Sequence, residues 1–241
     1  MKISKGILKK NNLFHYLIIL TFIFLFLIFI LYIYYFKYRK EHFYSNDKPF
    51  YDENNEIIDI VRNEHDEQNL VNKYIDNNDI VLELGARYGT VSVIINNNLN
   101  NINKYKHYVV EPDNNVWDAL EKNKLNHNSK FEIIKGIISK NKHSLTSYSN
   151  YGTRALKNDN GNIKLFDIPD EKFNTLVVDC EGCFYEFYNE FPDFVNNLDK
   201  IILECDYGGD IDYKNIIDKL INNNFYIKET IRDFHYVFIK K

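Results

Sequence analysis

The hydrophobic pattern divides the chain into one long apolar segment and a remainder in which short apolar runs alternate with polar stretches. Residues 13–36 contain no Asp, Glu, Lys or Arg, and as a helix these roughly 24 residues exceed the hydrocarbon thickness of a bilayer. Tyr16 lies near one end and Tyr34 and Tyr35 near the other, where amphipathic rings prefer the headgroup region. We therefore predict a single transmembrane helix over 13–36, behind a basic tail over 1–12.

Two other interpretations of the apolar segment fit less well. A cleaved signal peptide would have an apolar core of about 7–15 residues that ends at small residues, and no alanine precedes Ala86. A core helix this apolar on every face would need protein on all sides. Basic residues on the two flanks nearly balance, so the positive-inside rule leaves the orientation open.

The rest of the chain has the pattern of an α/β domain. Residues 37–65 are polar and acidic, which favours a tether, and a single domain is expected over 66–241. Its alternating apolar runs and amphipathic stretches are typical of βαβ units that build a parallel sheet. The predicted strands are residues 80–84, 108–111, 131–134, 175–179, 201–204, 225–229 and 234–240, of which the last two could pair as an antiparallel hairpin. Helices are predicted to begin near Asp66, Tyr88, Asn114, Gly182 and Asp212.

Charge and cysteine content narrow the choice of partners and compartment. The chain has 241 residues and a formal net charge of −4, and its interspersed charges give no field that would hold a polyanion. Nucleic acid is therefore not expected as a partner. The three cysteines, an odd number without a disulfide framework, favour a reducing compartment. They are Cys180, Cys183 and Cys205.

Four predicted strands end in a carboxylate. These acids are Glu83, Glu111, Asp179 and Glu204. Ligands of open α/β sheets bind beyond the carboxyl ends of the strands, so four acids at that edge indicate a binding site. The alternative is that the acids merely stop strands and cap helices.

The strongest local motif runs from Glu83 to Gly89. A buried strand delivers an acid to a glycine turn that opens a helix, and Gly85 and Gly89 allow close backbone approach and unusual φ angles. A dinucleotide fold would require Gly-x-Gly-x-x-Gly around a pyrophosphate. An acid two residues before Gly85 would repel a pyrophosphate, but it could engage the positively charged methionine end of S-adenosylmethionine.

Glu111 strengthens this interpretation because it closes the next strand. An acid at that position can accept both ribose hydroxyls of an adenosine. Its separation from Glu83 is about 28 residues, longer than the usual 20 or so. The Asn-rich stretch over 96–103 can absorb the difference as a loop.

A third motif, Asp179-Cys-Glu-Gly-Cys-Phe184, follows the fourth predicted strand and presents two carboxylates close together in the sequence. The chain resembles the FkbM-type methyltransferases, in which an Asp-x-Gly-Ala-x-x-Gly turn, a Glu-Pro after the second strand and an Asp-x-Glu-Gly-Ala-Glu turn follow in this order. Here they read Glu83-Leu-Gly-Ala-Arg-Tyr-Gly89, Glu111-Pro112 and Asp179-Cys-Glu-Gly-Cys-Phe184. The resemblance spans roughly residues 79–206. Cys183 and Phe184 depart from the family pattern.

The resemblance implies a doubly wound, mostly parallel seven-stranded sheet of the Rossmann-like class I methyltransferases. It also implies methyl transfer from S-adenosylmethionine to an acceptor, usually a hydroxyl of a glycan, a lipid-linked or another small molecule. We assign Asp179 or Glu181 as the group that orients the acceptor or takes its proton. The predicted cofactor-binding residues are Glu83, Gly85, Ala86, Gly89 and Glu111, with the backbone of Gly136 and Ile137 beside the adenine.

Two alternatives remain open at this level. The departures at Cys183 and Phe184 are compatible with a catalytically silent binding module of the same fold. A membrane-anchored sugar-nucleotide enzyme would need an Asp-x-Asp metal motif near a strand end. The close match, Asp210-Ile-Asp212, more plausibly opens a helix.

Several residues are expected to have no chemical role. The Cys180–Cys183 spacing lacks the context of a redox or zinc motif, so we predict no metal site. The scattered His107, His127 and His143 are expected at the surface or in loops. A cytosolic cofactor and unpaired cysteines together favour a single-pass membrane protein with its catalytic domain on the cytosolic face.

Overall fold

The computed structural model describes residues 19–33, 48–59, 64–99, 107–147, 152–206 and 210–241. The chain divides into two compact units, 1–47 and 48–241. In the first unit, residues 19–33 are helical and exposed. Within the part of the chain that the structure describes, no helix combines the length and apolar character needed to cross a membrane. The other residues of the predicted span, 13–18 and 34–36, lie outside the described residues.

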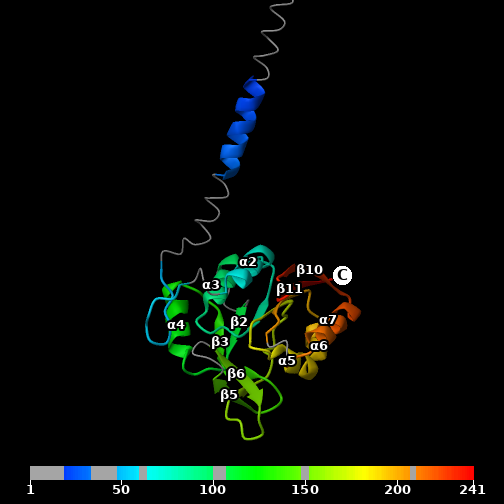
Figure 1. Ribbon diagram of the computed structural model, residues 1–241. Helices are drawn as coiled ribbons and strands as arrows, with labels where there is room; N and C mark the ends of the chain where they lie inside the picture. Colours follow the sequence, from blue (N-terminus) through cyan, green and yellow to red (C-terminus); the bar gives the residue numbers. More distant parts are fainter. Residues whose placement is uncertain (1–18, 34–47, 60–63, 100–106, 148–151, 207–209) are drawn as a thin grey trace, which may run out of the picture. The chain divides into compact units, whose positions relative to one another are not determined.

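The second unit is built on a seven-stranded sheet with the strand order β10-β11-β9-β8-β1-β2-β3 (Figure 1). Neighbouring strands from β9 to β3 run parallel, whereas β11 runs antiparallel to both β9 and β10. The fold is therefore the predicted Rossmann-like, mostly parallel sheet with a closing hairpin. The strands are β1 (Val81–Leu84), β2 (His107–Glu111), β3 (Glu132–Lys135), β8 (Thr175–Val178), β9 (Lys200–Glu204), β10 (Phe225–Ile231) and β11 (His235–Lys240).

Helices cover both faces of this sheet. The side chains of a strand alternate between the two faces, so Leu82 and Leu84 of β1 pack in one core with α5, α6 and α7, while Val81 packs in the other with α2 and α3. Both faces are buried, which explains the continuous apolar runs in the sequence. The helices are α2 (His65–Tyr74), α3 (Thr90–Asn98), α4 (Trp117–Asn126), α5 (Phe184–Glu190), α6 (Pro192–Asn196) and α7 (Tyr213–Asn222).

Two small sheets between β3 and β8 were not predicted. One pairs β4 (Ile137–Ile138) with β7 (Leu165–Phe166), and the other pairs β5 (His143–Ser147) with β6 (Thr153–Lys157). The β5–β6 hairpin projects from the lower part of the domain in Figure 1. Its strands are mostly polar, so they lack the apolar runs that identified the others.

Part of the segment expected to be a tether belongs to the folded unit, which begins at Lys48. Phe50 is 3% exposed and packs with Leu120. The side-chain amide of Asn123 donates to the carbonyl of Tyr51 at 2.8 Å and accepts from its N–H at 2.9 Å. Residues 48–59 are thus tied to α4.

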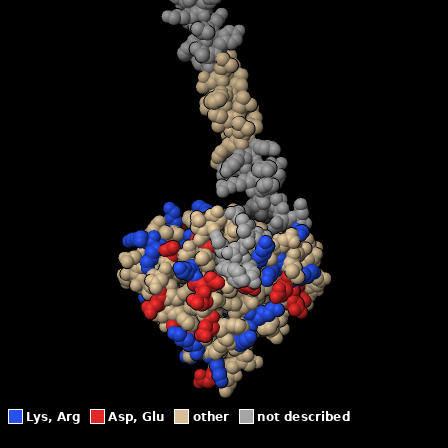
Figure 2. Space-filling view, turned by 180° about the vertical axis from the view of Figure 1, so that it is seen from behind, with Lys and Arg blue, Asp and Glu red and all other residues tan. Residues whose placement is uncertain are grey.

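The surface carries charges of both signs. Lys and Arg alternate with Asp and Glu over the face in Figure 2, with no broad patch of one sign. This distribution agrees with the near-balance of charge in the sequence.

Candidate active site

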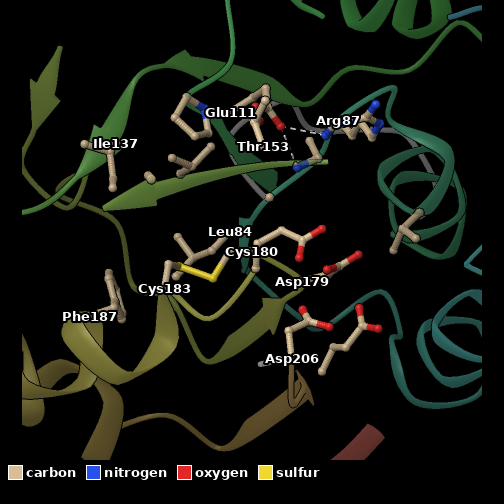
Figure 3. Close-up of a pocket in the computed structure, with 18 of the residues that line it drawn as sticks. Leu84, Arg87, Glu111, Ile137, Thr153, Asp179, Cys180, Cys183, Phe187 and Asp206 are labelled. Atoms are coloured by element: carbon tan, nitrogen blue, oxygen red, sulfur yellow. Dashed lines mark hydrogen bonds between the residues drawn. A yellow bond between two sulfur atoms is a disulfide. The ribbon is translucent and has the colours of Figure 1, made fainter. Parts of the chain in front are cut away.

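A cavity of about 560 Å³ lies at the carboxyl edge of the sheet. Its wall includes Leu84 to Arg87 after β1, Glu111 and Pro112 after β2, Asp179 to Glu181 after β8, and Glu204 at the end of β9. Figure 3 shows several of these side chains around the cavity. The volume is in the range of small-molecule sites.

The glycine turn after β1 borders this cavity. Gly85 has φ +86°, and a Cβ there would lie 1.7 Å from the carbonyl oxygen of Asp179. The position therefore requires glycine, because the turns after β1 and β8 touch through their backbones. Gly89, at φ +79°, is the N-cap of α3 and is not among the cavity-lining residues that the structure describes.

Glu111 holds the glycine turn in place. One carboxylate oxygen accepts the N–H groups of Ala86 and Arg87 at 3.2 and 2.7 Å, and the other accepts the N–H of Asp113 at 2.7 Å. Burial raises the pKa of Glu111, and the three backbone hydrogen bonds oppose that rise. The dashed lines in Figure 3 mark two of these bonds, at the wall of the cavity.

Glu83 points away from the cavity, unlike the predicted contact with the methionine end. Because side chains alternate along β1, Glu83 lies on the face opposite Leu84. Its carboxylate accepts from the hydroxyl of Ser92 at 2.8 Å and lies 2.7 Å from Nε2 of His107. Glu83 is 1% exposed and is not among the described lining residues.

The three histidines expected at the surface are all buried. His107 supports Glu83 as described above. His143 lies 2.9 Å from a carboxylate oxygen of Glu186, and His127 stacks on Phe50. The expectation of surface or loop positions was wrong for His107 and His143, which lie in β2 and β5. His127 does lie in the turn after α4, but it is buried there.

The predicted adenine wall is met in part. Ile137, in β4, lines the cavity and is followed there by Ile138. Gly136 is not among the described lining residues, and a Cβ at this position would lie 2.3 Å from the carbonyl oxygen of Lys164. Gly136 thus makes room for the chain entering β7.

Acidic side chains gather on the opposite wall. Asp179 and Glu181 line the cavity as predicted, together with Glu204 and Asp206 after β9. Burial, together with the charge of neighbouring carboxylates, raises the pKa of Glu204 to about 8 and that of Asp206 to about 7. Burial and the nearby Glu204 also raise the pKa of Asp179 well above its ordinary value.

Sequence reasoning missed Glu67, which joins this group from the first turn of α2. It is 3% exposed and lines the cavity. Burial and the charge of Asp179 raise its pKa well above the ordinary value for a glutamate. The sequence signal was weak, because an acid in the first turn of a helix is common.

The lining of the cavity is strongly acidic as a whole. Among the described lining residues, ten are Asp or Glu, two are Arg and none is Lys. Such a cavity favours a cationic ligand and disfavours a phosphorylated one.

A disulfide joins Cys180 and Cys183, with the two Cα atoms 5.4 Å apart. Both residues line the cavity (Figure 3). The premise that the cysteines are unpaired was therefore wrong for this pair, although Cys205 is free and buried. Phe184 is fully buried in the core.

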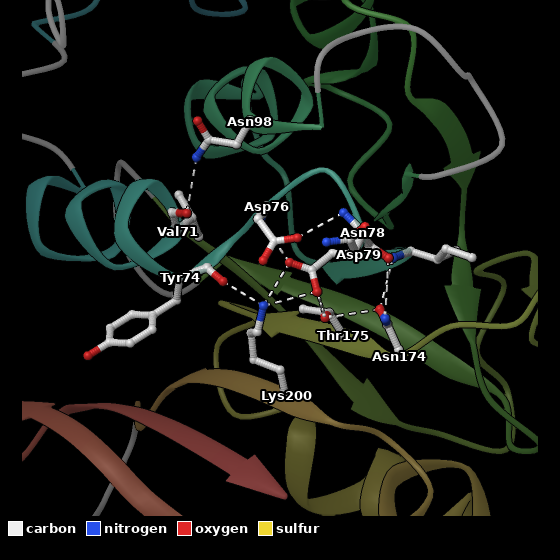
Figure 4. Close-up of polar contacts among 10 residues, drawn as sticks. Val71, Tyr74, Asp76, Asn78, Asp79, Asn98, Asn174, Thr175 and Lys200 are labelled. Atoms are coloured by element: carbon white, nitrogen blue, oxygen red, sulfur yellow. Dashed lines mark hydrogen bonds and ion pairs between the residues drawn. The ribbon is translucent and has the colours of Figure 1, made fainter.

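The opposite, amino edge of the sheet holds a different acidic site (Figure 4). Nζ of Lys200 lies 2.9 and 2.7 Å from the two carboxylate oxygens of Asp79, and it also donates to the carbonyl of Tyr74. The hydroxyl of Thr175 donates to the same carboxylate at 2.8 Å. This network closes the amino ends of β1, β8 and β9.

The chain was compared with protein families, curated proteins and solved structures. No protein-family model and no curated protein matches the chain. Among solved structures, a ribosomal protein L11 methylase from Lactobacillus delbrueckii subsp. bulgaricus is similar at 14% identity and a TM-score of 0.45, over 72% of this chain and 76% of that one. TrmK of M. capricolum, in complex with S-adenosyl-homocysteine, is similar at 14% identity and a TM-score of 0.42, over 72% and 66%. The M. jannaschii tRNA m1G37 methyltransferase is similar at 16% identity and a TM-score of 0.39, over 74% of this chain and 50% of that one.

Proposed function

We propose that the folded unit binds S-adenosylmethionine at the carboxyl edge of its sheet and transfers the methyl group to an acceptor hydroxyl. The observation that carries this proposal is the acidic cavity, in which ten acidic residues outnumber two arginines. S-adenosylmethionine has a positive sulfonium and a positive amino group, and carboxylates stabilise both charges.

Glu111 is the residue we assign to the ribose. Its carboxylate accepts three backbone N–H groups, and an ionised carboxylate has about four lone-pair sites. It can therefore accept a further hydrogen bond from a hydroxyl. Ile137 and Ile138 supply an apolar wall suited to adenine, and Gly85 and Ala86 bring backbone to the end assigned to methionine.

Asp179 and Glu181 are the residues we assign to the acceptor. When bound, the cofactor supplies a methyl group on an excellent leaving group. The protein's own part is to align the acceptor hydroxyl and to exclude water. The raised pKa of Asp179 suits a group that takes the hydroxyl proton late in the reaction. The acceptor class we propose is a glycan, a lipid-linked molecule or another small molecule.

A sugar-nucleotide enzyme is disfavoured by the same charges, since a diphosphate would be repelled. Its Asp-x-Asp candidate is also engaged elsewhere. Asp212 is the N-cap of α7, where it accepts the N–H of Asn215 at 3.0 Å, and Asp210 lies 3.4 Å from Arg154.

Methyl transfer can be measured directly. The 241-residue chain would be incubated with methyl-labelled S-adenosylmethionine and separate lipid, glycan, RNA and protein fractions. We expect label in the lipid or glycan fraction, and loss of transfer in Asp179→Asn. A matched control is Asp218→Asn, which removes an exposed acid that pairs with Lys214 on α7.

Other outcomes would change the proposed acceptor, favour the silent module or overturn the proposal. Label in RNA would replace the proposed acceptor class. Cofactor binding without transfer to any fraction would favour the silent module. Binding of a sugar nucleotide in place of S-adenosylmethionine would overturn the proposal.

The location of the domain is a separate proposal that rests on the sequence alone. We propose attachment to a membrane through residues 13–36, with the domain on the cytosolic face. Protection of the domain from protease added outside intact cells would agree with this. Digestion of the domain by protease added outside intact cells would contradict a location on the cytosolic face.

A further inference from the structure

Three carboxylates from three separate elements meet beside the cavity. Glu67 comes from α2, Asp179 follows β8 and Glu204 ends β9. One oxygen of each lies within 4.8 Å of the others. The parallel pairing of β8 with β9 aligns Val178 with Leu203, so the acids that follow these residues arrive side by side.

Glu67 gives a second and independent observation. It is 3% exposed, and its Oε2 atom is buried without a hydrogen-bond partner among the described residues. A buried carboxylate oxygen without a partner is costly. This atom belongs to a carboxylate that lines the cavity beside Asp179 and Glu204, where a bound cation would give it a partner.

Positive charge near the three acids is weak. Nε2 of His235 lies 3.5 Å from Glu204, and no lysine is among the described residues that line the cavity. Arg232 lies 3.2 Å from the carboxylate of Asp66. Asp79 at the amino edge differs from these acids, because Nζ of Lys200 lies 2.7 Å from its carboxylate.

We propose that Glu67, Asp179 and Glu204 bind a divalent cation of the hard, oxygen-preferring class, Mg²⁺ or Mn²⁺. Carboxylate oxygens without sulfur or imidazole ligands select such ions over zinc or copper. A cation would balance three like charges that cannot otherwise share one volume in ionised form.

The use of this cation rests on the proposed function. The ion would lie at Asp179, the residue assigned to the acceptor, so it would coordinate the acceptor hydroxyl and lower the pKa of that hydroxyl. The acceptor would then be one whose hydroxyl reaches the metal. Glu181, outside the three ligands, would be left to take the proton.

Titration of Mn²⁺ into the metal-free 241-residue chain, followed by the electron paramagnetic resonance of free Mn²⁺, tests the site without cofactor. We expect one saturable ion per chain. Glu67→Gln and Glu204→Gln should each weaken the affinity by about tenfold or more. Asp218→Asn, which removes an exposed acid of α7 that pairs with Lys214, should keep the affinity of the unchanged chain.

Thermal unfolding distinguishes variants that have lost a metal ligand from variants that no longer fold. Mn²⁺ should raise the melting temperature of the unchanged chain and of Asp218→Asn, but not that of Glu67→Gln or Glu204→Gln. Without metal, both variants should melt no lower than the unchanged chain, because each loses a buried like charge. No saturable Mn²⁺ binding by the unchanged chain, or unchanged binding in both variants, would overturn the proposal.

Cofactor binding measured in a chelator keeps the two proposals distinct. S-adenosylmethionine binding without Mn²⁺ binding would leave the proposed function and remove the metal site. Mn²⁺ binding without S-adenosylmethionine binding would keep the site and remove its assigned use.

Discussion

Buried acids have different neighbours at the two edges of the sheet. At the amino edge, Asp79 is matched by Lys200 and by the hydroxyl of Thr175. At the carboxyl edge, Asp179 and Glu204 lie beside each other and beside further acids, and burial raises their pKa values. A satisfied network stabilises a fold, whereas clustered like charges cost stability and persist where a ligand offsets them.

We therefore assign a structural role to the amino edge and ligand binding to the carboxyl edge. Substitutions at the amino edge should change stability while leaving ligand chemistry alone. Substitutions of the clustered acids at the carboxyl edge should do the reverse. Four expected outcomes test this division, taken from the largest effect on stability to the smallest.

Lys200→Met should be the most destabilising change. It leaves the buried Asp79 carboxylate without its cation, which costs about 3–5 kcal/mol of unfolding free energy. Denaturant unfolding measures the loss. Lys214→Met, at an exposed pair with Asp218, is the control and should change stability by less than about 0.5 kcal/mol. Equal losses of unfolding free energy in Lys200→Met and Lys214→Met would contradict a special structural role for the amino edge.

Gly85→Ala should destabilise the carboxyl edge through the backbone rather than through charge. Its left-handed φ and the contact with the carbonyl of Asp179 together predict a loss of about 2–4 kcal/mol. Chemical denaturation followed by circular dichroism measures this loss of unfolding free energy. A loss below about 0.5 kcal/mol would show that the turns after β1 and β8 are not in contact.

Removal of the Cys180–Cys183 disulfide should have a smaller effect. The bond closes a short loop, for which loop-closure entropy predicts about 2 kcal/mol. The double variant Cys180→Ser/Cys183→Ser should unfold at lower denaturant concentration and respond no further to a reductant. A native chain whose stability is unchanged by reductant would contradict the bond's role.

Asp179→Asn should leave stability unchanged or raise it by up to about 1 kcal/mol in the absence of metal, because it removes one of several clustered charges. Methyl transfer should be lost in the same variant. Asp79→Asn, its counterpart at the other edge, should lower stability because Lys200 loses its partner. A clear loss of stability in Asp179→Asn would remove the distinction between the edges.

Apolar runs were sufficient to predict the sheet. All seven main strands and the closing hairpin were predicted. Central strands such as β8 are buried on both faces, which favours apolar residues, whereas β10 is largely exposed and was predicted as the partner of β11 across a short turn. The β5–β6 hairpin was not, since its sequences, such as His143-Ser-Leu-Thr-Ser147, carry no such run. The tight turns at Gly85 and Gly89 were predicted because glycine alone adopts their φ angles readily.

The site was predicted less completely, for reasons that differ among residues. The alternation of β1 already placed Glu83 on the face opposite Leu84, so its turn away from the cavity could have been read from the sequence. Glu67 could not, because it reaches Asp179 through a tertiary contact across about 110 residues. The Cys180–Cys183 bond was not predicted, because an odd number of cysteines without a disulfide framework favoured a reducing compartment.

Titration calorimetry of S-adenosylmethionine into the 241-residue chain, with metal removed by a chelator, tests the central claim most directly. One cofactor should bind per chain, and Glu111→Ala should abolish binding while circular dichroism shows the fold retained. Lys200→Met, under conditions in which it remains folded, should bind as the unchanged chain does. No binding by the unchanged chain, or equal affinity in Glu111→Ala, would contradict a cofactor site at the carboxyl edge.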